Sequence, residues 1–78
     1  MRFFASADRH GADHDDALWV MAHPVVTVLL REDQEKLLHI GFDRVGRARE
    51  VITDTSVSTG EPVVIHADDL TPAYYEFL

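Results

Sequence analysis

Cysteine is absent from this chain of 78 residues. Without thiols, the sequence excludes a disulfide framework, a thiolate zinc site and a cysteine nucleophile, and a reducing compartment is the natural location. Long apolar runs are lacking too, because a stretch such as residues 25–30, which includes Thr27, is far shorter than the ~20 residues that cross a bilayer. The N-terminus has no apolar stretch typical of a signal peptide. We therefore expect a cytoplasmic protein with no membrane partner.

Basic residues are scarce. Lys and Arg number 7 against 14 Asp and Glu, which gives a formal net charge of -7. Because nucleic-acid affinity depends largely on Lys and Arg that neutralise phosphates, this balance disfavours general binding to RNA or DNA. The one basic cluster is Arg44, Arg47 and Arg49. These side chains are either solvated strand and turn residues or a patch that contacts RNA or an acidic protein.

The chain contains no linker, repeat or low-complexity segment, which predicts a single domain over residues 1–78. Residues 13–22 have helical spacing, with Asp13 as the N-cap and Pro24 beyond the C-terminal end. The helix face expected in the core consists of Ala17, Leu18, Met21 and Ala22.

Four stretches favour β-strands, at residues 25–30, 37–42, 47–53 and 62–67. Polar residues 31–36 and the turn at Asp43–Gly46 join the first three strands as hairpins. Thr71-Pro72 is typical of a helix start, so a short helix should end the chain. The sequence thus predicts an α+β fold with an N-terminal helix, a four-stranded, mainly antiparallel sheet and a short C-terminal helix.

Several short motifs resemble those of a known group. Residues 6–11, Ser-Ala-Asp-Arg-His-Gly, followed by Asp15-Asp16-Ala17 and His23-Pro24, are similar to the N-terminal stretch of small toxin-like proteins common in actinobacteria. Residues 40–46, Glu50-Val51 and residues 64–67 resemble their later half. These proteins are distantly similar to BrnT toxins of the RelE superfamily. The resemblance implies a RelE/BrnT-like fold, a toxin of a type II toxin–antitoxin module, metal-independent ribonuclease activity, and neutralisation by an antitoxin protein.

RNA cleavage without metal or other cofactor needs a base for the 2′-hydroxyl, an acid for the leaving oxygen and a cation on the phosphate. His66, near the end of a predicted strand, with Glu50 and Arg49 from another, provides suitable groups. We predict these three as catalytic residues and Arg44 and Arg47 as RNA-binding. Strand alternation sets the arginines on one face and a half-buried Glu50 on the other. The competing interpretation makes His66 a structural histidine and Glu50 the partner of an arginine.

Two observations leave other functions open. His10 and His14 are four residues apart, but no third nitrogen ligand is fixed nearby, so we expect no metal site. Asp68-Asp69 follows the last strand, where BrnT-like proteins place basic residues. This departure favours the alternative function, a non-catalytic toxin-derived module that acts through protein–protein interaction. A second copy of the chain is a further candidate partner, as is RNA.

Overall fold

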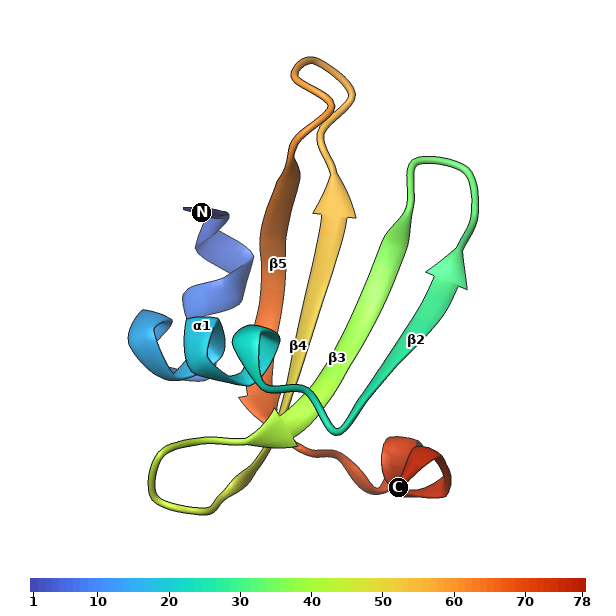
Figure 1. The fold of residues 1–78 in the computed structure, drawn as a ribbon. Coiled ribbons are helices and arrows are strands. Elements are labelled where there is room, and N and C mark those ends of the chain that lie inside the picture. The colour runs from blue at the N-terminus through green and yellow to red at the C-terminus, as the bar shows by residue number, and fades with distance from the viewer.

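A computed structural model describes residues 1–78. Its elements, in chain order, are β1 (Arg2–Phe3), the 3₁₀ helix η1 (Ala5–Asp8), α1 (His14–Ala22), β2 (Val26–Arg31), β3 (Lys36–Phe42), β4 (Ala48–Thr55), β5 (Pro62–Asp69) and the 3₁₀ helix η2 (Pro72–Phe77). The strands form one sheet in the order β1-β5-β4-β3-β2, and α1 crosses in front of it (Figure 1). The predicted α+β class is confirmed. No helix is long and apolar enough to span a membrane.

The prediction of four strands is wrong, because the sheet has five and is mixed. β1 pairs in parallel with β5, with Arg2 opposite Val63 and Phe3 opposite Val64, while the other neighbours are antiparallel. Two residues cannot show the alternation that marks a strand. This strand is defined by a partner about sixty residues away, and no local pattern reports such a pairing.

The helix α1 begins as predicted, because the Asp13 carboxylate accepts a hydrogen bond from the Asp15 N–H at 2.7 Å. Its buried residues are Ala17 and Val20, whereas Leu18 is 39% exposed. The predicted core face was therefore rotated. The C-terminal end of α1 can approach β3 closely because residue 41 is a glycine. A Cβ at this position would lie 3.2 Å from the His23 carbonyl oxygen. The end of α1 thus packs directly on the backbone of β3.

The sheet separates two apolar layers. The face covered by α1, here called the α1 face, holds a buried cluster of Ala7, Ala17, Val20, Val51, Val64 and Ala67. The opposite face, here called the η2 face, holds Leu38, Ile40 and Leu70, against which Ala48, Ile52, Tyr74 and Phe77 pack. Successive residues of β4 therefore point to different layers, as the pleat requires. This alternation decides which candidate site residues can meet.

Candidate functional site

His66 and Glu50 are in contact on the η2 face. Ile52 pairs with His66 in the register of β4 and β5, which makes Glu50 and His66 diagonal neighbours. The His66 Nε2 lies 2.7 Å from the Glu50 Oε2. Glu50 Oε1 accepts a second hydrogen bond, from the Thr71 N–H at 2.6 Å. Glu50 is 2% exposed, so it is more deeply buried than the half-buried position that we predicted.

His10 and Asp68 extend this pair. The rings of His10 and His66 meet edge to face with centroids 5.6 Å apart, and His10 Nδ1 lies 3.6 Å from Asp68 Oδ2. These four residues, His10, Glu50, His66 and Asp68, are called the histidine–carboxylate cluster below. His66 keeps 25% of its side chain exposed, so a ligand can reach it.

The histidines considered as a metal pair have separate partners. His14 Nε2 contacts Asp8, and its ring stacks on Phe3 with centroids 3.8 Å apart. His10 is directed at Asp68. No group of three or more His, Asp or Glu side chains has an arrangement that could hold a metal ion.

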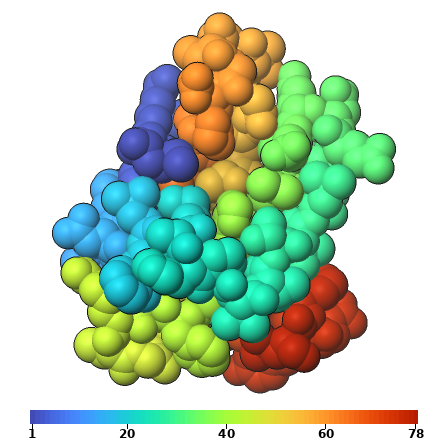
Figure 2. Space-filling model, viewed as in Figure 1, coloured from blue at the N-terminus to red at the C-terminus, as the bar shows by residue number.

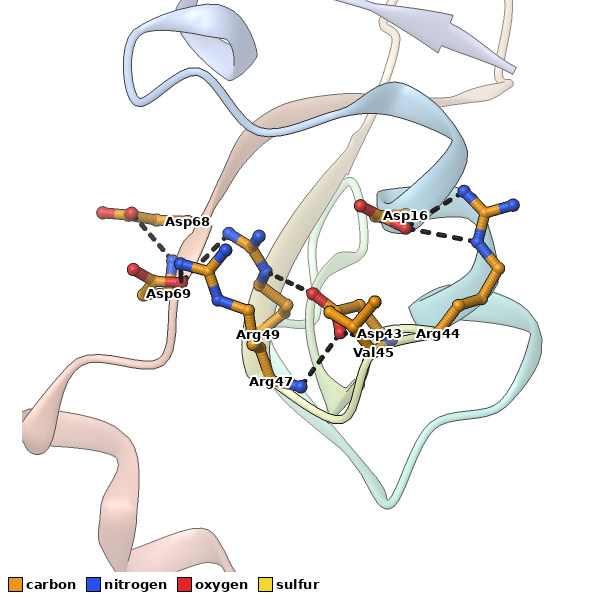
Figure 3. Close-up of polar contacts among 8 residues, drawn as sticks. All are labelled: Asp16, Asp43, Arg44, Val45, Arg47, Arg49, Asp68 and Asp69. Atoms are coloured by element: carbon orange, nitrogen blue, oxygen red, sulfur yellow. Dashed lines mark hydrogen bonds and ion pairs between the residues drawn. The ribbon is translucent and has the colours of Figure 1, made fainter.

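Arg49 lies on the α1 face, away from His66. Its Nε donates a hydrogen bond to Asp43 Oδ2 at 3.0 Å, and its Nη1 lies 3.0 Å from Asp69 Oδ1 (Figure 3). Glu50 is the next residue of the same strand and points to the η2 face. The structure therefore brings His66 and Glu50 together and leaves Arg49 on the other side of the sheet. The three predicted catalytic residues do not share a cleft.

Arg44 and Arg47, the predicted RNA-binding residues, are also paired with carboxylates. Arg44 donates from Nη2 to Asp16 at 3.1 Å, and Arg47 Nη2 lies 3.6 Å from Asp69 Oδ1. Figure 3 shows the arginine side chains between aspartates from α1, the β3–β4 turn and the end of β5. We call this set the arginine–aspartate network; its members are Asp16, Asp43, Arg44, Arg47, Arg49 and Asp69.

Asp43 organises the network. Its carboxylate accepts hydrogen bonds from the N–H groups of Val45 and Arg47 and from the Arg49 side chain. The backbone hydrogen bond from Arg47 lowers the pKa of Asp43, and the bonds from Arg49 and Val45 lower it further, although burial acts in the opposite direction. The sequence identified Asp43 only as a turn residue. Its position immediately before the basic cluster was the available signal for the wider role.

A small hollow lies between the start of α1 and β4 and β5. Its lining residues are Ala12, Asp13, Asp16, Ala17, Arg49, Glu50, Val51, Ala67 and Asp68. Four acidic residues against one paired guanidinium make this hollow a poor place for a phosphate.

The comparisons with known proteins return no match. The scan against protein-family models matches none, and neither the curated proteins nor the solved structures include a significant match. The RelE/BrnT resemblance therefore stays a prediction from the motifs of this chain.

Proposed function

We propose that this chain is a toxin-derived binding module that acts through protein–protein interaction and does not cleave RNA. The arginine–aspartate network is the observation that carries this proposal. Each arginine of the only basic cluster already has a carboxylate within 4 Å, and Arg49 has two. A phosphate would have to displace these carboxylates before it could bind.

The position of Arg49 supports the same conclusion. A transition-state cation must lie on the side of the reaction where the acid and base act, since electrostatic stabilisation depends on fixed geometry. His66 and Arg49 lie on opposite faces of the sheet. The net charge of -7 adds long-range repulsion toward a polyanion. A protein partner, such as the antitoxin that the family resemblance implies, need not carry the dense negative charge of a nucleic acid.

RNA cleavage is the second candidate, because one specific observation favours it. The 2.7 Å contact between His66 Nε2 and Glu50 Oε2 is the arrangement in which a carboxylate orients a histidine for proton transfer. His66 is accessible, and His10 lies beside it. For RNA cleavage, a residue other than Arg49 must supply the cation that binds the phosphate.

Induced expression in a bacterial host, with and without the neighbouring reading frame, separates the two functions. The binding module predicts no growth arrest when the chain is expressed alone, and a stoichiometric complex when the neighbouring product is present. His66→Ala should leave that complex intact, and His23→Ala provides a matched control at an exposed histidine. Growth arrest and RNA cleavage that disappear in His66→Ala, but persist in His23→Ala, would instead establish the ribonuclease. Absence of any complex would contradict the binding module.

A further inference from the structure

The longest uncharged stretch of the chain forms one surface. Residues 17–30 contain no Asp, Glu, Lys or Arg, although such residues make up 27% of the sequence. The stretch covers most of α1 and nearly all of β2. In Figure 2 it extends without a break from the cyan helix to the blue-green strand beside it. A neutral surface of this extent is unusual on a molecule of charge -7.

Large apolar side chains are exposed on this surface. They are Leu18 at 39%, Trp19 at 41%, Val25 at 56%, Leu29 at 50% and Leu30 at 40%. Leu29 and Leu30 are successive residues of β2 and point to opposite faces of the sheet. Both belong to the same edge strand, and an edge strand with exposed apolar side chains favours pairing with another chain. We call this group, with β2, the neutral surface.

The backbone of β2 is also unpartnered on one side. β2 is the last strand of the sheet and has β3 as its single neighbour. Near the opposite edge of the sheet, the backbone of β5 has partners on its outer side. β1 pairs with β5, and Ser6 Oγ donates a hydrogen bond to the Ile65 carbonyl oxygen at 2.6 Å. Natural proteins block open edges with charged residues, proline or β-bulges. Residues 26–30 contain no charged residue and no proline, and the one register shift of β2 lies at its end, between Leu29 and Arg31.

We propose that β2 pairs antiparallel with β2 of a second copy of this chain, so that two sheets join into one. The distribution of charge along the chain indicates which partner pairs with β2. Residues 17–30 contain no carboxylate, so a basic partner would find no counter-charge there, whereas a second copy of the chain presents the same uncharged strand. The same strand on both sides makes a two-fold, self-complementary interface.

Charge also selects the antiparallel direction. β2 runs into a hairpin loop that contains Glu32, Asp33 and Glu35. Antiparallel pairing places the two loops at opposite ends of a six-residue strand, about 20 Å apart at ~3.4 Å per residue. That separation exceeds the Debye length of about 8 Å at physiological salt. Parallel pairing would bring the loops together.

Sedimentation velocity of the purified chain over a wide concentration range tests this dimer without requiring the partner proposed above. We expect a reversible dimer in the wild type. Leu29→Lys should weaken it about tenfold or more, since two-fold pairing brings both lysines close. Val45→Lys, at an 80% exposed valine in the β3–β4 turn, is the matched control and should leave the dimer unchanged. Thr27→Lys, at an exposed residue within β2, replaces Leu29→Lys if circular dichroism shows that the latter disturbs the fold.

Hydrogen exchange provides the second readout. Amide protection in β2 should rise with protein concentration, while the amides of the β3–β4 turn should show no such rise. A monomer at every concentration would overturn the inference. So would a dimer that Leu29→Lys and Thr27→Lys leave intact, or one that adds no protection to β2.

Discussion

The two faces of the sheet satisfy their charged groups in different ways. On the α1 face, the Arg49 guanidinium lies between two carboxylates, one of which, Asp69, is 61% exposed. On the η2 face, the Glu50 carboxylate is 3% exposed and is held by one histidine and one backbone N–H. The comparison shows that two successive residues of β4 belong to separate polar systems. The charged groups of each system pair mostly with groups of the same system, so neither system presents an unpaired charge to a phosphate.

The difference in burial predicts a difference in energetic cost. An exposed ion pair contributes little to stability because water and salt screen it. A buried hydrogen-bonded carboxylate leaves its partners unsatisfied when it is removed. Substitutions on the η2 face should therefore cost more than those on the exposed part of the arginine–aspartate network.

Glu50→Ala should have the largest effect. It removes the acceptor of the Thr71 N–H and the partner of His66, so we expect a loss of about 3 kcal/mol in the free energy of unfolding. Urea denaturation measures this loss. Glu50→Gln, which keeps an oxygen for Thr71, should recover part of it. Equal stability of Glu50→Ala and wild type would show that the η2 face is not the costlier one.

Asp43→Asn should have the next largest effect and should depend on pH. The hydrogen bond from the Arg47 N–H, with those from Arg49 and Val45, lowers the pKa of Asp43 below 3.8 in the folded chain. The carboxylate therefore stabilises the fold above about pH 3.8, and this contribution is lost as the pH falls through the lowered folded pKa. The stability gap between wild type and Asp43→Asn should be full at neutral pH and shrink in acid. A gap that grows in acid would contradict the assignment.

The sequence predicted local features better than the joining of distant ones. The helix at α1, its Asp13 cap and four of the strands follow from spacing and capping chemistry. The exposure of Leu18 and the presence of β1 do not follow from local patterns, because both depend on contacts with residues far away in the sequence. For the site, the pairing of His66 with Glu50 needed the register of β4 and β5. The placement of the Arg49 and Glu50 side chains on opposite faces of the sheet needed only the alternation of one strand.

His66→Ala should cost about 1 kcal/mol, less than Glu50→Ala, because His66 is 25% exposed and water can replace it beside Glu50. Thermal unfolding at neutral pH measures this cost. His10→Ala removes the edge-to-face neighbour and leaves the contact between His66 and Glu50 in place, so it should cost less. A larger loss for His10→Ala than for His66→Ala would show that the hydrogen bond to Glu50 is not the main contribution of the cluster.

The smallest effect should come from His39, on the α1 face. Burial lowers the pKa of His39 below 6.5, and its Nε2 lies 2.9 Å from the Thr53 Oγ1. The folded chain therefore holds this ring neutral, and its stability falls as the pH drops from 6.5 through the lowered folded pKa, because the unfolded chain binds the proton first. His39→Gln removes the titrating group, so the variant should gain stability relative to wild type in mild acid. An NMR titration of the His39 ring gives the direct measurement, and a midpoint at or above 6.5 would contradict the prediction. A lowered midpoint would show that burial on the α1 face disfavours the charged form of the His39 ring.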